Sequence, residues 1–149
     1  MLVSTDRHSS RETRDFARAF SFSAGFFYRA RGKKTIEGLV SEARKKGENT
    51  LALFSFSEIS FISISISGWE WKDKIIKVLK YSFGKEKPKG SEISSFEGMD
   101  GKKFQSLFGF DDFYGGNAIL FAGDGKLKIM RKDKNLLEME YELQKKVEG

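Results

Sequence analysis

One stretch, residues 2–39, decides the fold: LVSTDRHSSRETRDFARAFSFSAGFFYRARGKKTIEGL. It opens with a short apolar run at Leu2-Val3, which is typical of a strand, and continues with a helical pattern. A basic extended segment follows, and a second helix begins after Thr35, whose hydroxyl can cap it. The alternation of strand and helix predicts an α/β protein.

The first helix of this stretch is predicted to separate its side chains onto two faces. Ser9-Ser10-Arg11-Glu12 has the form of a capping box, in which the Ser9 hydroxyl accepts from the Glu12 amide. Gly25 can end the helix in a left-handed conformation. At about 100° per residue, one face carries Thr13, Phe16, Ala17, Phe20 and Ala24, and the other carries Arg11, Arg14 and Arg18. We therefore expect a core-facing side and a cationic side.

The positive charge of the chain is concentrated in the same stretch. Residues 7–34 hold eight basic and two acidic residues, so their net charge of +6 equals that of the whole chain. The eight basic residues are Arg7, Arg11, Arg14, Arg18, Arg29, Arg31, Lys33 and Lys34. Arginine forks bind phosphates bidentately and stack on bases. Arg29 and Arg31 alternate in a strand that we expect to end at Lys34, so they would point the same way. These eight are candidate RNA-binding residues, and the alternative is a solvated charged face.

Motifs in the first third of the chain carry a family resemblance. They are Leu2-Val3-Ser4-Thr5-Asp6-Arg7, Ser9, Thr13-Arg14-Asp15-Phe16 and Arg31-Gly32-Lys33, with sparser matches at Gly90-Ser91-Glu92, residues 106–111 and a terminal strand near Leu136–Leu143. Together they resemble the archaeal Brix-domain proteins, which are ribosome-biogenesis factors. Asp6 stands where the family has serine, and His8-Ser9 where it has lysine-proline, so a carboxylate lies among the arginines.

The resemblance implies a fold of two unequal halves, each like the anticodon-binding domain of class II tRNA synthetases. The order of predicted elements agrees with a mixed, largely antiparallel sheet and packed helices. We expect one domain over residues 1–149, with approximate halves 1–68 and 69–149. Further strands are predicted at 51–56, 61–67, 118–122, 126–131 and 136–143, and a helix at 101–108. Residues 74–82 fit the spacing of a strand or of a helix, and the resemblance favours a strand.

Three details of this prediction can be checked locally. The 61–67 strand alternates isoleucine with serine and should be paired on both sides, because such a strand would aggregate as an open edge. Glu58-Ile59-Ser60 is predicted as the turn before it, and Asp124-Gly125 as a hairpin turn. The segment 68–74, with Trp69 and Trp71, is expected to bridge the two halves.

Residues for catalysis and metal binding are scarce. The chain has no cysteine and one histidine, His8, which excludes thiolate zinc sites, cysteine nucleophiles and a catalytic triad. Gly98–Gly101 is interpreted as an ordinary turn, Asp111-Asp112 as a solvated loop, and Phe108–Tyr114 as core packing rather than a base-stacking platform. We expect no cofactor, no metal and no enzymatic activity.

The apolar runs of the sequence bear on where in the cell the protein is expected. The longest apolar run, Ala118–Ala122, is too short to span a membrane, and no secretion signal is visible, so we expect a cytoplasmic monomer. Residues 72–89 form a second basic stretch with seven lysines. It would extend the arginine face if the two lie side by side.

The sequence thus predicts a non-catalytic ribosome-biogenesis factor. It would bind ribosomal RNA or its precursor through the basic helix and strand, and assist RNA folding or assembly, with ribosome-assembly proteins as further partners. The alternative is a protein–protein adaptor of a pre-ribosomal particle that makes no direct RNA contact.

Overall fold

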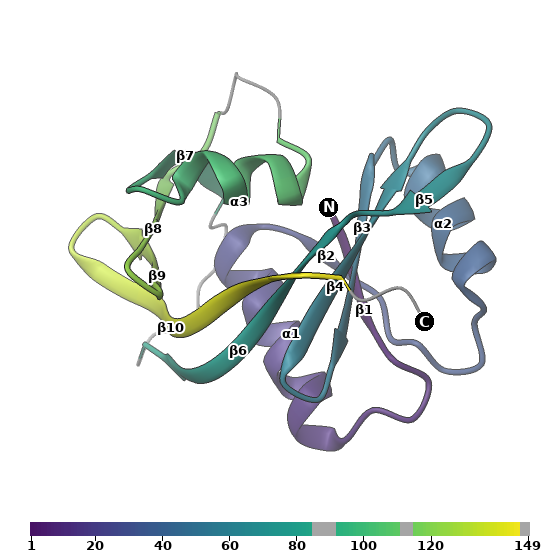
Figure 1. Cartoon of the computed structure of the whole chain (residues 1–149), viewed down its shortest axis with the longest axis horizontal. Helices are drawn as coiled ribbons and strands as arrows, with labels where there is room; N and C mark the ends of the chain where they lie inside the picture. Colours follow the sequence, from purple (N-terminus) through teal and green to yellow (C-terminus); the bar gives the residue numbers. More distant parts are fainter. Residues whose placement is uncertain (85–91, 111–114, 147–149) are drawn as a thin grey trace.

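Three helices and ten strands make up the computed structural model, which describes residues 1–84, 92–110 and 115–146 (Figure 1). In chain order they are β1 (Leu2–Thr5), α1 (Arg11–Ala24), β2 (Phe27–Tyr28), α2 (Ile36–Lys45), β3 (Thr50–Ser55), β4 (Glu58–Ile64), β5 (Trp69–Trp71), β6 (Lys74–Phe83), β7 (Ile93–Glu97), α3 (Gly101–Phe108), β8 (Ala118–Gly123), β9 (Lys126–Arg131) and β10 (Lys134–Lys145). The strands form one curled sheet in the order β2-β1-β3-β4-β6-β10-β9-β8-β7, and β5 pairs with β4 beside this path. The mixed, largely antiparallel sheet with packed helices confirms the predicted fold class.

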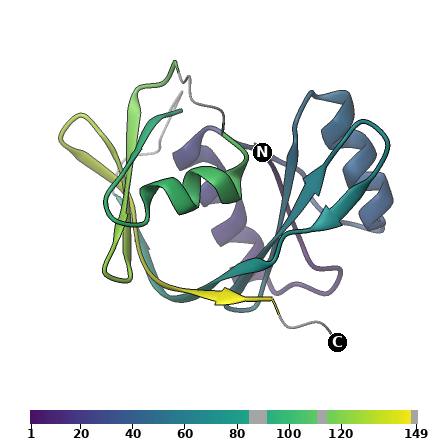
Figure 2. The ribbon, with the colours of Figure 1, turned by 45° about the horizontal axis from the view of Figure 1, so that its top comes forward.

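The helices occupy different sides of the curled sheet. The curled sheet has an N-terminal arm, made of β1 to β5, and a second arm, made of β7 to β10, and β6 joins them. Figure 2 shows α1 and α3 between the two arms and α2 on the outside. Phe16 and Phe20 of α1 are buried with Phe104 and Phe108 of α3 in the inner core. A second, smaller cluster lies under α2, and it joins Leu2, Leu39, Val40, Ala43, Leu51, Leu53, Ile62 and Ile64. The N-terminal arm of the sheet is therefore covered on both faces.

The start of α1 differs by one residue from the prediction. Ser10, not Ser9, is the N-cap, and its hydroxyl oxygen accepts from the amide of Thr13 at 3.1 Å. Ser9 instead donates its hydroxyl to Thr5 Oγ1 at 3.0 Å, which ties it to the end of β1. The predicted core face of the helix is confirmed, because Thr13, Phe16, Ala17, Phe20 and Ala24 are all buried.

The expected basic strand is shorter than predicted. β2 contains only Phe27 and Tyr28, whereas we expected it to reach Lys34. Its parallel pairing ends at Val3↔Tyr28, and the last main-chain bond runs from Arg29 N to Val3 O. Gly32 then adopts φ +52°, a left-handed conformation that turns the chain toward α2.

The β3–β4 hairpin is tighter than predicted. The turn consists of Phe56 and Ser57, with Ser57 at φ +60°, and Glu58 already belongs to β4. The prediction that this strand is paired on both sides is confirmed: β3 lies on one side, and β5 and β6 lie on the other. The segment 68–74 contacts α3 through Lys72 and the end of β10 through Trp71, whose ring centroid lies 4.0 Å from Lys146 Nζ, whereas Trp69 packs in the α2 cluster.

The second arm contains one strand that the pattern did not indicate. β7 is parallel to β8, and α3 connects the two. The segment ISSFE has only two apolar residues, and its partner strand lies beyond the helix, so local periodicity carries little signal. The predicted hairpin at Asp124-Gly125 is confirmed, with φ of +53° and +73°. β6 is a strand, as predicted, and pairs with β10.

Candidate nucleic-acid interface

Two loops at one edge of the sheet bring several of the predicted cations together. Because β1 and β2 are parallel, the loops that follow them leave the same edge. Arg7 Nη2 donates to the main-chain oxygen of Lys33 at 3.3 Å, so the two loops are joined directly. Arg7 and Lys33 are exposed and Lys34 is half-buried. These three cations therefore share one corner of the molecule.

The outer face of α1 continues this corner. Arg11, Arg14 and Arg18 are exposed on it, as predicted. Arg14 Nη1 donates to the main-chain oxygen of Ser9 at 2.5 Å, which aims its guanidinium toward the start of the helix. The guanidinium of Arg18 lies over the ring of Tyr28, 5.4 Å from its centroid, and so connects the helix to β2. Arg11 forms only a long, exposed ion pair with Asp15, at 3.8 Å.

Arg29 and Arg31 do not point the same way, because both follow the end of β2. Arg31 is half-buried, and it donates from Nη1 to Thr5 O at 3.0 Å and from Nε to Lys34 O at 2.6 Å. Arg29 Nε lies 3.2 Å from Glu42 Oε2 of α2. Both guanidinium groups are thus engaged by the protein itself, Arg31 in a half-buried position and Arg29 at the surface. The predicted cations that neither Glu42 nor the Thr5 and Lys34 carbonyls hold, which we call the cationic surface, are Arg7, Arg11, Arg14, Arg18, Lys33 and Lys34; all are exposed except the half-buried Lys34.

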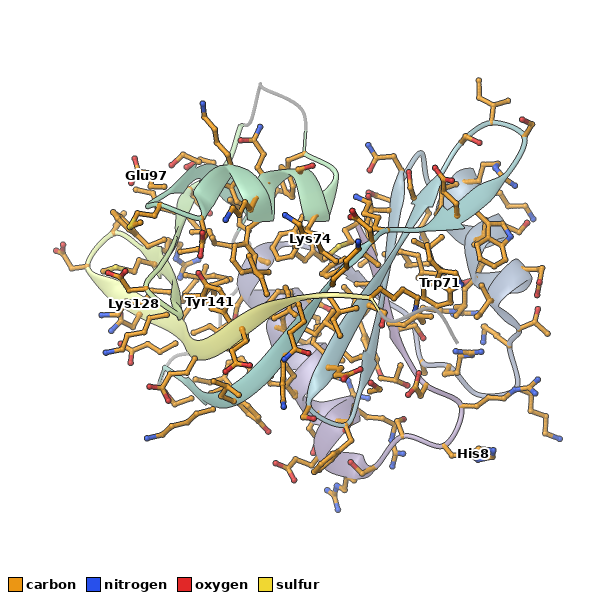
Figure 3. All side chains as sticks on the ribbon, in the orientation of Figure 1. His8, Trp71, Lys74, Glu97, Lys128 and Tyr141 are labelled. Atoms are coloured by element: carbon orange, nitrogen blue, oxygen red, sulfur yellow. The ribbon has the colours of Figure 1, made fainter. Side chains whose placement is uncertain are left out.

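Besides Asp15, which pairs with Arg11, the carboxylate of Asp6 lies beside the cationic surface. Partial desolvation raises the pKa of Asp6 above its ordinary value; Arg31 opposes this shift and Glu58 adds to it. The neighbouring His8 is exposed, and Figure 3 shows its side chain pointing away from the body of the protein. Asp6 is therefore the residue that weakens the positive potential at this corner.

Sequence reasoning missed the aromatic edge next to these cations. β2 is the first strand of the sheet and has one neighbour, β1. Phe27 on this strand is 50% exposed, and Lys46 Nζ lies 5.0 Å from the centroid of its ring. Phe22 on α1 is 55% exposed. The Phe26-Phe27-Tyr28 run was visible in the sequence, but its exposure depends on the end of the sheet.

The other candidate residues from the sequence, in the stretches 72–89 and 108–114, lie in different surroundings. Lys72 of the second basic stretch is turned inward, where its ammonium donates to Leu107 O at 2.9 Å, and Lys80 lines a groove with Glu12. Lys85, Lys87 and Lys89, like Asp111-Asp112, Phe113 and Tyr114, lie outside the described residues. Phe108 is buried and Phe110 packs on Phe26, in agreement with core packing.

The part of the chain that the structure describes contains neither a cluster of metal ligands nor a membrane-spanning helix. No three histidine, aspartate or glutamate side chains gather there as metal ligands would. Within the same described ranges, none of the helices has the length and apolarity that a membrane crossing requires.

Comparison with known proteins places the fold. No protein-family model and no curated protein sequence matches the chain. Solved structures do match, and two of them are a probable ribosomal biogenesis protein from Aeropyrum pernix, with a TM-score of 0.73, 19% identity and coverage of 99% of this chain and 96% of that one, and Mil, an archaeal Imp4-like protein, with a TM-score of 0.68, 21% identity and coverage of 98% and 100%. At these identities the likeness establishes a shared fold over the whole length. The shared fold agrees with the resemblance found in the sequence.

Proposed function

We propose that this chain is a non-catalytic ribosome-biogenesis factor that binds ribosomal RNA or its precursor through the cationic surface. The observation that carries the proposal is the hydrogen bond between Arg7 and Lys33, which joins two basic loops beside the arginine face of α1. The fold shared with a probable ribosomal biogenesis protein and an Imp4-like protein supports the same role. We further propose that the chain acts as a single, monomeric, cytoplasmic domain.

The chemistry of this surface suits phosphate binding. Arg14 is held by Ser9 and Arg18 by Tyr28, so their guanidinium groups lose little freedom when an anion binds. Each cation can neutralise one phosphate and release condensed counterions. The spread of the cations over two loops and a helix would align an RNA segment along this face. We propose no catalytic step, since His8 is exposed and the chain has no cysteine.

The salt dependence of RNA binding tests this proposal. The purified chain is titrated with a fluorescein-labelled single-stranded RNA at several salt concentrations. If about four to six phosphates are neutralised, log K should fall with log salt at a slope of about −3 to −4, from about −0.7 per contact. The double variant Lys126→Ala/Lys128→Ala, on β9, is the matched control and should keep the slope.

Two outcomes contradict RNA binding by this surface. One is the absence of micromolar affinity at low salt, and the other is a slope near zero. Either would favour the adaptor that makes no direct RNA contact, in which the cationic surface is only solvated.

A further inference from the structure

A groove of about 490 Å³ lies between the first turn of α1, the β3–β4 turn and β6. Its floor is apolar and buried, since Phe16, Phe54 and Ile59 are 6%, 1% and 1% exposed. Its rim is apolar and exposed, since Phe56 is 83% and Leu79 is 53% exposed. A pocket of this size is large enough to hold a side chain with its neighbouring backbone.

The backbone holds both rim residues outward. Phe56 occupies the tight turn with Ser57, and the amide of Val78 donates to Ser57 O at 2.8 Å, which fixes the turn against β6. Leu79 is the extra residue of a β-bulge, because Glu140 pairs with Lys80 while Tyr141 pairs with Val78. A bulge re-aims side chains and is often found beside functional sites. The two side chains therefore frame the groove without adding to the core.

Carboxylates line the same groove. Glu12 and Glu58 both face it, and the hydroxyl of Tyr81 donates to Glu12 Oε1 at 3.2 Å. Lys80 also lines the groove, and Lys77 is paired with Glu58 in the β4–β6 register. Asp15 acts on Tyr81 electrostatically, and Glu58 on Asp6, so further negative charge lies close by. An apolar floor with acidic groups at its end is complementary to a segment that is apolar and basic.

We propose that this groove binds a segment of another protein, which inserts a large apolar side chain between Phe56 and Leu79 and places a lysine or arginine beside Glu12 and Glu58. RNA is disfavoured because carboxylates repel phosphate. The site is independent of the proposed RNA binding. Glu12, Thr13 and Phe16 of α1 face the groove, whereas Arg11, Arg14 and Arg18 face away from it. One helix thus separates a protein-binding side from the cationic surface.

Selection of peptides tests the site on the full chain. A phage-displayed library of short random peptides is selected on the immobilised protein, and enriched sequences are synthesised with a fluorescent label for anisotropy. The enriched peptides should share one large apolar residue flanked by lysine or arginine. Their affinity should fall at least about tenfold in Phe56→Ser and in Leu79→Ser, because each removes an anchor contact. Glu58→Lys should reverse the charge preference.

Phe22→Ser is the matched control, because it removes a phenylalanine that is similarly exposed but does not line the groove. It should leave peptide affinity unchanged. The melting temperatures of Phe56→Ser, Leu79→Ser and Phe22→Ser should stay close to that of the wild type, since these side chains are exposed. If Phe56→Ser alone fails to fold, Leu79→Ser and Glu58→Lys decide the question.

Several outcomes overturn the proposal. One is that no peptide is enriched, or that the enriched peptides are acidic or lack an apolar residue. A second is that Phe56→Ser and Leu79→Ser both keep wild-type affinity. A third is that labelled RNA displaces the peptides and binds Phe56→Ser more weakly, which would make RNA the occupant. A fourth is a wild-type dimer in sedimentation that Phe56→Ser abolishes, which would make a second copy the occupant.

Discussion

The guanidinium of Arg31 donates a hydrogen bond to the main-chain oxygen of Thr5 at 3.0 Å. Its Nε atom donates to Lys34 O at 2.6 Å, so one side chain joins the end of β1 to the loop after β2. Gly32 supplies the left-handed turn between them. In the motif Arg31-Gly32-Lys33, the first two residues therefore shape the loop, and the third is exposed on the cationic surface.

Arg31→Ala should lower the free energy of unfolding by about 1.5–3 kcal/mol, because two partly buried carbonyl groups lose a charged donor. Chemical denaturation measures this loss. Lys33→Ala is the control: it should leave stability unchanged and flatten the salt slope of RNA binding by about 0.7. A variant Arg31→Ala that is fully stable but binds RNA weakly would show that Arg31 contacts RNA directly.

Arg14→Ala combined with Arg18→Ala should flatten the salt slope by up to about 1.4, the share of two phosphate contacts. The melting temperature should change little, because exposed charges contribute little to folding and the Arg18–Tyr28 contact is worth about 0.5–1 kcal/mol. Phe20→Ala on the opposite face is the contrasting variant. Phe20 is 1% exposed, and its loss should cost about 3–5 kcal/mol. An unfolded arginine variant would mean that these residues are structural.

Asp6→Asn should stabilise the protein at neutral pH. Because desolvation raises the pKa of Asp6 in the fold, the contribution of Asp6 to stability is present in acid and is lost as the pH rises through that raised pKa. The asparagine variant should therefore melt at a higher temperature than the wild type at neutral pH, and the difference should disappear below the ordinary pKa of 3.8. Melting curves across pH measure the effect.

The same substitution removes a negative charge from the neighbourhood of the cationic surface, so RNA affinity at neutral pH should rise. Glu97→Gln, on the edge strand β7, is the charge-matched control and should leave affinity unchanged (Figure 3). A wild type that is more stable than Asp6→Asn at neutral pH would show instead that the carboxylate is held favourably by Arg31.

Lys72→Met should destabilise the contact between the two arms of the sheet. Lys72 Nζ donates to two carbonyl oxygens in the last turn of α3, to Ser106 O at 3.0 Å and to Leu107 O at 2.9 Å. Burial lowers the pKa of this lysine. Removal of the donor takes this partner from Leu107 O, whereas Ser106 O keeps the amide of Gly109, and such a loss costs about 1–3 kcal/mol. Chemical denaturation compares the free energy of unfolding of Lys72→Met with that of the control Lys74→Met, which replaces an exposed lysine on β6. Equal stabilities would mean that water replaces the ammonium.

Much of the fold could be predicted because its signals are local. The core face of α1 follows from a helical period of 3.6 residues, and the caps at Thr35 and Gly25 follow from residue types that suit those positions. The β8–β9 hairpin follows from Asp124-Gly125, which accept positive φ angles. In each case the residues that determine the structure are within one or two turns of each other.

The sequence by itself therefore determined the amphipathic helix, the β8–β9 hairpin and the concentration of positive charge in residues 7–34. Only the tertiary structure decided which cations have a partner within the protein, because Arg31 is held by a carbonyl 26 residues away and Arg29 by a carboxylate on α2. The same holds for β7, which exists because β8 supplies its hydrogen bonds, and for the groove, whose walls come from three distant segments. Patterns along a chain report on neighbours in sequence, whereas pairing and exposure depend on contacts that form only when distant segments meet.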